Sequence, residues 1–262
     1  MTLDTLDIEY RGAAAWVWLN RPAVHNAFDE TLIAELTATL DSLGQDADSR
    51  VVVLAGRGKS FSAGADLNWM RKQGQADMAE NLADARRLAE LFRVLSVCPK
   101  PTIARVHGAA MGGGMGLAAA CDICVASTAA VFATSEVRLG LVPGVISPYV
   151  VRAIGERHAY RYFQTAEKIS ANRAYDIGLV HEVTVPEALD EIVQNMIDAL
   201  LLGGPHAQAA CTDLIRTVAN KPITPELIDA CAHRIAALRA SDQAKEGLTA
   251  FLEKRAPNWG GS

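Results

Sequence analysis

The hydrophobic positions of this 262-residue chain follow two periods, one typical of strands and one typical of helices. Apolar runs of strand length lie at residues 13–19, 50–55, 102–106 and 122–126. Between them, apolar residues recur every three to four positions over residues 29–43 and 78–97, as on one face of a helix. Asp29 is placed to cap the first of these helices, and the prolines of segment 98–101 end the second. This alternation predicts an α/β fold with parallel strands covered by helices.

The pattern changes from about Pro186, after which we expect helices and no further strand. The expected helices cover residues 189–202, 205–219, 225–239 and 242–255. We therefore expect a core of residues 1–200 and a helical region of residues 201–262. A helical appendage of this kind extends a site or forms an oligomer. Residues 258–262 are expected to be a loose tail.

Composition limits the classes of partner. Half of the residues are apolar and 21% are charged, which is ordinary for a soluble globular protein. The net charge of −5 argues against nucleic acid or an anionic membrane surface as the main partner. No apolar run approaches the ~20 residues of a membrane span, and no signal-peptide pattern opens the chain.

The five cysteines are odd in number and lack framework spacing, so we expect reduced thiols and a cytoplasmic protein. Cys121 and Cys124 form a CxxC without a second pair, so we expect buried apolar residues and no metal.

Residues 107–140 carry most of the chemical information. The β-branched run at 102–106 leads into three consecutive glycines, Gly112, Gly113 and Gly114, and helix-forming residues follow. Glycine at such a turn lets another backbone or a ligand approach closely. The first amides of a helix have no internal partner, and the helix dipole adds partial positive charge. Glu136 is a lone carboxylate in the largely neutral stretch that follows. The pattern indicates an oxyanion site with a base.

Two other interpretations compete for the glycine-rich stretch. Residues 114–119 fit the dinucleotide-binding fingerprint, with Glu136 as its ribose-binding acid. In that fingerprint, however, the acid ends the second strand, and Glu136 lies well beyond the strand expected at 122–126. Alternatively, the glycines serve only a tightly packed strand-to-helix crossing.

Three motifs in order resemble those of the enoyl-CoA hydratase/isomerase (crotonase) superfamily. They are FSAGADL at 61–67, HGAAMGGGMGLAAACDICVAS at 107–127 and SEVRLGLVP at 135–143. The flanking segments NRPxxxNA at 20–27 and FLEKR at 251–255 match the same family, so the resemblance covers nearly the whole chain. It implies a spiral of β-β-α turns with a C-terminal helical trimerisation region, and a homotrimer or a dimer of trimers. It also implies acyl-CoA thioester substrates, with coenzyme A as part of the substrate and no separate cofactor.

The resemblance assigns roles to particular residues. The backbone N–H groups of Ala65 and Gly113 would stabilise the thioester oxyanion, and Glu136 would transfer the proton. The positions that match substrate-binding residues are Ala23, His25, Ala63, Asp66, Leu67, Gly112, Gly116, Tyr149 and Lys254. Arg21 and Lys254 would meet the CoA phosphates. Four apolar residues either wall the acyl pocket or belong to the core: Trp69, Met70, Leu91 and Phe92.

Two departures from the family pattern affect the expected reaction. Family hydratases usually carry a first glutamate where this chain has Gly116, so only Glu136 is retained. One glutamate suffices to move a proton between C2 and C4, which is isomerase chemistry, and it supports hydration if another group positions the water. The nearby candidates for that group are Ser135, Ser147 and Tyr149.

The second departure is segment 142–163, which is similar to bacterial hydratases of 3-methylglutaconyl-CoA and γ-carboxygeranoyl-CoA. This implies a branched acyl group with a distal carboxylate, in fatty-acid or branched-chain amino-acid catabolism. Candidate cationic partners are Arg71, Lys72, Arg138 and Arg152. We expect an enoyl-CoA hydratase, with a Δ3,Δ2-enoyl-CoA isomerase, a non-catalytic acyl-CoA-binding protein and a nucleotide-binding oxidoreductase as alternatives.

Overall fold

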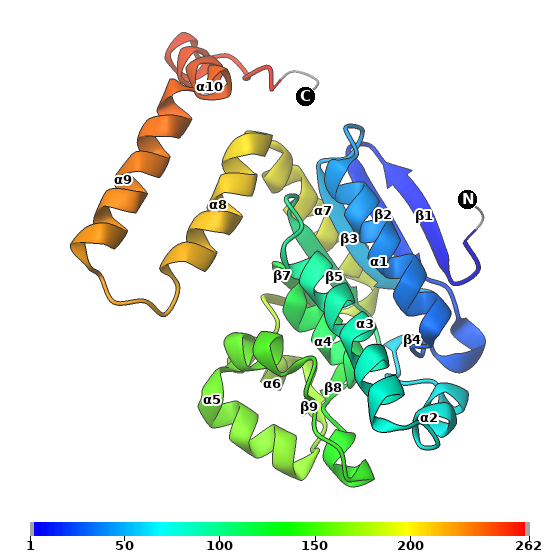
Figure 1. Cartoon of the computed structure of the whole chain (residues 1–262). Helices are drawn as coiled ribbons and strands as arrows, with labels where there is room; N and C mark the ends of the chain where they lie inside the picture. Colours follow the sequence, from blue (N-terminus) through cyan, green and yellow to red (C-terminus); the bar gives the residue numbers. More distant parts are fainter. Residues whose placement is uncertain (1–2, 260–262) are drawn as a thin grey trace. The chain divides into compact units, whose positions relative to one another are not determined.

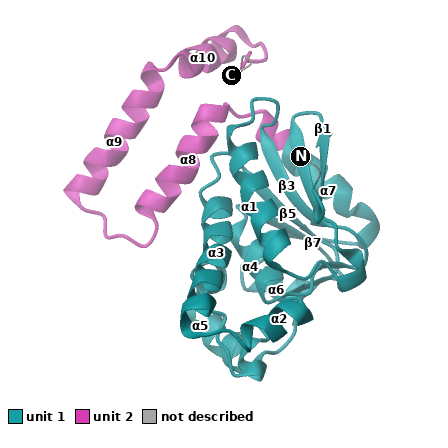
Figure 2. Cartoon of the chain, turned by 45° about the vertical axis from the view of Figure 1, so that its right-hand side comes forward, with its two compact units in different colours: residues 1–197 teal, residues 198–262 magenta. Residues whose placement is uncertain are grey.

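The computed structural model describes residues 3–259. The chain divides into two compact units, Met1–Ile197 and Asp198–Ser262 (Figure 2). Every strand of the described residues lies in the first unit, and the second unit is helical. The α/β class expected from the hydrophobic pattern is therefore confirmed.

The first unit contains a six-stranded sheet of order β1-β2-β3-β5-β7-β10. Its strands are β1 (Leu6–Arg11), β2 (Ala14–Leu19), β3 (Val51–Gly56), β5 (Thr102–Val106), β7 (Ile123–Ser127) and β10 (Glu182–Thr184). Only β1 runs antiparallel to its neighbour; the other pairs are parallel. A four-stranded sheet has the order β4-β6-β8-β9. Its strands are β4 (Ser60–Ser62), β6 (Ala109–Met111), β8 (Val131–Ala133) and β9 (Ile169–Ser170).

The chain fills the two sheets in alternation, which makes a spiral (Figure 1). The pairs β3 and β4, β5 and β6, and β7 and β8 each give one strand to each sheet, and helices follow each pair. These helices are α2 (Leu67–Gln73), α3 (Met78–Ser96), α4 (Gly113–Ala120) and α5 (Ser147–Thr165), whereas α6 (Ala171–Asp176) follows β9. The helix α1 (Glu30–Gln45) connects β2 to β3. Because each pass repeats the same order, the turns after successive β-β units stack near one another.

Many of the longer elements agree with the sequence-based expectation, but the six-residue β1 and the nineteen-residue α5 were not expected. The four expected strands are β2, β3, β5 and β7, and the Asp29 carboxylate caps α1 by accepting from the Leu32 N–H at 2.8 Å. The strands of the smaller sheet were not expected, because two or three residues are too short to show an alternating pattern. Helix α4 begins at Gly113, inside the glycine run, several residues before its apolar composition starts.

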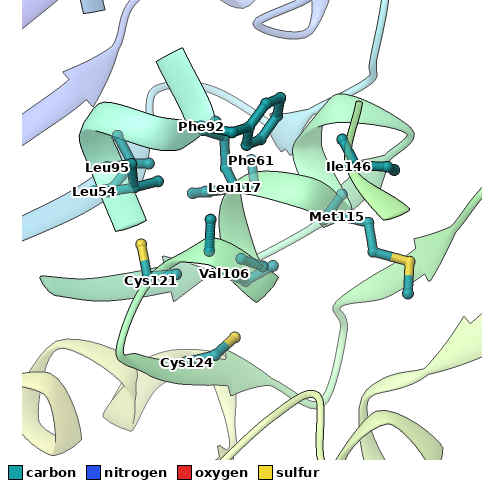
Figure 3. Packing of buried hydrophobic residues seen from close by; sticks show 14 of the residues in the cluster. Leu54, Phe61, Phe92, Leu95, Val106, Met115, Leu117, Cys121, Cys124 and Ile146 are labelled. Atoms are coloured by element: carbon teal, nitrogen blue, oxygen red, sulfur yellow. The ribbon is translucent and has the colours of Figure 1, made fainter. Parts of the chain in front are cut away.

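Helix α4 lies at the centre of the core and is packed unusually closely (Figure 3). Its buried Met115 and Leu117 lie among side chains of the surrounding elements. A Cβ built on Gly114 would lie 2.6 Å from the carbonyl oxygen of Ser62, so this helix can approach β4 only because residue 114 has no side chain. Cys121 and Cys124 are buried beside it, and burial raises the pKa of the Cys124 thiol to about 12. Such a thiol stays protonated and behaves as an apolar group.

The second unit contains three helices that bury little. Helix α7 (Leu189–Leu201) crosses the boundary, and α8 (Pro205–Val218), α9 (Pro225–Ala240) and α10 (Asp242–Glu253) follow. Neither α8 nor α9 has a buried residue, and α10 buries only Ala250. The expected loose tail is partly wrong: the Asn258 N–H donates to Glu246 at 2.7 Å, and the Trp259 indole N–H donates to the Leu202 carbonyl at 3.2 Å. Residues 260–262 lie outside the described part of the chain. In that described part, none of the helices combines the length and the apolar character needed to cross a membrane.

Candidate active site

The turn after β4 presents the backbone of Ala65. The Phe28 N–H donates to the Gly64 carbonyl at 2.7 Å, and the Asp66 N–H donates to the Phe28 carbonyl at 2.8 Å. Ala65 lies opposite Phe28 in this parallel bridge and makes neither bond. Its own N–H therefore has no acceptor among residues 3–259. Gly64 has φ +92°, a conformation that side-chain-bearing residues rarely adopt, so glycine is needed to form the turn.

Ion pairs hold the far side of this turn. The Asp66 carboxylate accepts from the Asn68 N–H at 2.8 Å and caps α2, and Arg21 lies 3.1 Å from the same carboxylate. Burial opposes ionisation of Asp66, but these two donors and the Trp69 N–H outweigh it and hold the pKa of Asp66 below its usual range. Arg21 also pairs with Asp29 at 2.7 Å. The structure thus gives Asp66 and Arg21 partners within the turn, although the resemblance suggested substrate contacts for both.

The NRPxxxNA loop fastens the neighbouring segments together. Asn26 is fully buried and donates to the carbonyl oxygens of Arg57, Ser60 and Phe61, at 2.9, 2.8 and 3.2 Å. His25 is exposed, and its Nδ1 lies 3.0 Å from the Ser60 hydroxyl. The organising role of Asn26 was missed from the sequence. An asparagine able to adopt a positive φ, here 55°, between two turn-forming segments was the available signal.

The second turn presents the backbone of Gly113. The Gly112 N–H donates to the Ala133 carbonyl at 2.8 Å, which fixes the turn against β8. Gly112 has φ +49°, so it also needs the freedom of glycine. Gly113 is the first residue of α4, and its N–H has no acceptor among the described residues. It is one of the orphan donors at the positive end of the helix dipole.

The carboxylate of Glu136 lies against the Gly112 turn, which itself approaches the Gly64 turn. A Cβ built on Gly112 would lie 3.0 Å from Oε1 of Glu136 and 4.0 Å from the Cα of Gly64. The other carboxylate oxygen, Oε2, is buried and has no hydrogen-bond partner in the described chain. Burial raises the pKa of Glu136, because desolvation outweighs the opposing effect of its own backbone N–H. The structure therefore gathers a carboxyl of raised pKa and two glycine turns, each next to an N–H without an acceptor.

The position of the missing first glutamate is occupied by apolar side chains. A Cβ built on Gly116 would lie 2.3 Å from Cγ2 of Ile146 and 3.0 Å from the ring of Phe92. Tyr149 packs on Phe92, with ring centroids 5.7 Å apart. The Ser147 hydroxyl donates to the Gly144 carbonyl at 2.8 Å. The role of Ile146 was missed from the sequence, because its side chain fills the space beside a glycine that lies thirty positions earlier in the chain.

Other expected site residues lie at several places. Ala23, Ala63 and Leu67 are exposed. Trp69, Leu91 and Phe92 are buried, which is the core interpretation of these apolar residues, and Met70 is half-buried. Lys254 belongs to the second unit, where it ends α10 with φ 56°, and its contact with CoA stays a prediction.

The geometry does not support a dinucleotide site at residues 114–119. Gly114 and Gly116 lie inside α4, against Ser62 and Ile146, and leave no space for a pyrophosphate. Glu136 follows β8 and does not end the second strand of such a unit. Two free amides and a nearby carboxylate instead define an enzyme class that stabilises an oxyanion and transfers a proton beside it.

Comparison with known proteins identifies the family. The family model described as enoyl-CoA hydratase/isomerase matches residues 9–262, and the chain belongs to this family of enzymes. A crystal structure of an enoyl-CoA hydratase from Shewanella pealeana is 44% identical, with a TM-score of 0.95 over 98% of this chain and 96% of that one. Crotonyl-CoA hydratase of Syntrophomonas wolfei is 32% identical over 99% of both chains. The 2,3-dehydroadipyl-CoA hydratase of Escherichia coli is 32% identical over 93% of both.

Proposed function

We propose that the protein is an enoyl-CoA hydratase that adds water across the 2,3 double bond of an acyl-CoA thioester. The observation that carries this proposal is the position of the Glu136 carboxylate against the Gly112 turn, which itself lies close to the Gly64 turn. The names of similar proteins, such as crotonyl-CoA hydratase, support the same reaction.

The mechanism follows from the charge that develops on the thioester. Addition of a nucleophile at C3 moves electrons through the double bond onto the carbonyl oxygen and forms an enolate. The N–H groups of Ala65 and Gly113 would donate to that oxygen and lower the energy of the enolate. Glu136 would take a proton from the attacking water and deliver one to C2. A raised pKa suits this exchange, because it makes the carboxylate a stronger base than an ordinary glutamate.

We propose a branched acyl group with a distal carboxylate, such as that of 3-methylglutaconyl-CoA, as the substrate. The support is the resemblance of segment 142–163, together with a relative whose named substrate, 2,3-dehydroadipyl-CoA, is also a dicarboxylic thioester. Lys72 is paired with Glu30, and Arg71 donates to Asn68. Arg138 is exposed on the same short turn as Glu136, so we favour it as the partner of the carboxylate.

One observation favours isomerisation as the second candidate reaction. Ile146 and Phe92 occupy the space beside Gly116, so no second carboxylate assists Glu136 there. A single carboxyl is enough to carry a proton from C2 to C4 of a 3-enoyl thioester.

Absorbance of the conjugated enoyl thioester separates the two reactions. Hydration of a 2-enoyl-CoA removes the absorbance, and isomerisation of a 3-enoyl-CoA creates it. The assay would use crotonyl-CoA, 3-methylglutaconyl-CoA and a 3-enoyl-CoA with the same enzyme preparation. Loss of absorbance with the branched substrate supports the proposal, and its absence with every 2-enoyl ester contradicts it.

We further propose a homotrimer or a dimer of trimers, located in the cytoplasm. Helices α8 and α9 bury no residue, yet each carries large apolar side chains: Ile215 is 64% exposed and Ile228 is 59% exposed. Such faces are stabilised when a neighbour covers them. Sedimentation should give about three or six times the 27.9 kDa monomer mass. A monomer at micromolar concentration contradicts this arrangement.

A further inference from the structure

Phe28 contacts both of the turns that carry a free N–H. It follows the buried Asn26 and is itself 1% exposed. Through its backbone, it bonds the residues on either side of Ala65, by donating to Gly64 and accepting from Asp66. These two bonds determine the direction of the Ala65 N–H without using it.

The ring of Phe28 lies against the other turn. A Cβ built on Gly113 would lie 3.0 Å from Cε2 of this ring and 3.3 Å from both Cδ2 and Cζ. Gly113 therefore rests directly on the aromatic ring, and no side chain fits between them. One buried residue is thus hydrogen-bonded to the first donor turn and packed beneath the second.

We propose that Phe28 is a positioning residue that fixes the separation of the Ala65 and Gly113 N–H groups. The two groups belong to successive turns of the spiral, and neither is held by a hydrogen bond of its own. Donors of an oxyanion must lie about 2.7–3.1 Å from one oxygen. Close-packed interiors transmit displacement, so a rigid ring between the turns sets this distance. The proposal rests on the oxyanion function assigned above to these two N–H groups.

The variant Phe28→Leu tests the proposal, because it removes the ring and keeps both backbone bonds. The matched control is Leu40→Ala on α1, which also truncates a side chain that is 1% exposed. We expect kcat of Phe28→Leu on crotonyl-CoA, or on the best enoyl-CoA of the panel, to fall at least about tenfold, with KM changed less than about threefold. Leu40→Ala should lower the melting temperature and leave kcat within about twofold.

A spectroscopic measurement reports the donors directly. Butyryl-CoA labelled with ¹³C at the thioester carbonyl has no double bond to hydrate, and its carbonyl stretch moves to lower frequency when the oxygen accepts hydrogen bonds. Bound to the wild type or to Leu40→Ala, it should show the full shift. Bound to Phe28→Leu, it should show about half of that shift or less. A full shift with normal kcat in Phe28→Leu overturns the proposal.

A second test perturbs the same contact from the Gly113 side, and the single variant Gly113→Ala can be measured whether or not Phe28→Leu folds. Gly113→Ala retains the N–H and places a Cβ 3.0 Å from the ring. It should reduce kcat and the carbonyl shift, and the reduction should be smaller when Phe28 is already Leu. Equal reductions in both backgrounds contradict the proposal. If the wild type itself neither shifts the carbonyl band nor turns over an enoyl-CoA, the proposed function fails, whatever Phe28 does.

Discussion

The first turn of α4 has two faces with opposite chemistry. On one face lie Gly112 and Gly113, with a free N–H and the Glu136 carboxylate 3.0 Å from where a side chain at 112 would begin. On the other face lies Gly116, where a Cβ would lie 2.3 Å from Cγ2 of Ile146. All three residues are glycine, and they differ in the neighbour that each one meets and in the positive φ of Gly112.

The difference shows how one glycine can keep a site open while another closes it. At Gly112 the missing side chain leaves the carboxylate beside the turn, with one oxygen unpartnered. At Gly116 the same absence admits an apolar side chain from the start of α5. The proposed acid–base chemistry is therefore confined to the Glu136 face.

Removal of the Glu136 carboxylate should abolish the chemical difference between the two faces, and it should have the largest effect on kcat of the changes considered. Glu136→Gln keeps the size of the side chain but cannot accept a proton, so kcat should fall by about 10²–10⁴-fold. KM should change little, because the N–H groups are retained. The exposed Glu187→Gln is the matched control and should behave as the wild type in the absorbance assay. Near-normal turnover of Glu136→Gln on every accepted ester would exclude Glu136 as the proton carrier.

The donor on the open face can be deleted at Gly113. This residue is the first of α4, a position where proline is well tolerated by the helix itself. Gly113→Pro removes the N–H, whereas Gly113→Ala adds a Cβ and retains it. We expect kcat of the proline variant to lie about 10²–10³-fold below that of the alanine variant. Equal kcat values, with both variants folded by circular dichroism, would show that this N–H does not contribute to the reaction.

The closed face can be tested by exchange of the two residues that fill it. Gly116→Glu alone places a side chain onto Ile146 and should reduce the free energy of unfolding by about 1–3 kcal/mol or more. In the Ile146→Gly background, the same change should be less damaging by about 0.5–3 kcal/mol, because the space is vacant. Denaturant unfolding of the four proteins measures this coupling. Additive losses would contradict the contact.

If hydration is limited only by the lack of a second carboxylate, the double variant Gly116→Glu with Ile146→Gly should hydrate crotonyl-CoA faster than Ile146→Gly alone. If another group already orients the water, the new carboxylate should slow the reaction. In either case, the unfolding free energies of the four proteins still test the contact between residues 116 and 146.

The smallest expected effect is the pH dependence that Glu136 gives to kcat/KM and to stability. Because burial raises the pKa of Glu136, kcat/KM for hydration should rise with pH and level off above the ordinary range of a glutamate. A carboxyl with a higher pKa when folded binds more protons in the folded state. Its contribution to stability is greatest below its unfolded pKa and is lost as pH rises through the folded pKa.

Glu136→Gln should remove this pH dependence and stabilise the protein near neutral pH by about 0.5–2 kcal/mol, as is common for a residue kept for function. Thermal unfolding between pH 4 and 8 checks the sign. A wild type that gains stability over this window because of Glu136 would contradict the raised pKa.

Local pattern was sufficient for segments such as α1 and α3 and for the chemical motifs, although the nineteen-residue α5 was not expected. The helical period predicted α1 and α3, and the Asp29 cap lies where a short acceptor before an apolar face is expected. The motifs with their glycines and Glu136 indicated the family. Short strands such as β4 and β6 gave no signal, because three residues are too few to show an alternating pattern.

The sequence by itself determined the α/β class, the family and the kinds of group in the site, because these depend on periodicity and motifs that each segment carries alone. Only the tertiary structure decided which groups meet. It showed that Glu136 lies against the Gly112 turn, that Ile146 fills the space beside Gly116, and that Phe28 contacts both donor turns. These contacts join residues far apart in the chain. Packing at distances of a few ångströms, which no local pattern records, decides whether such residues touch.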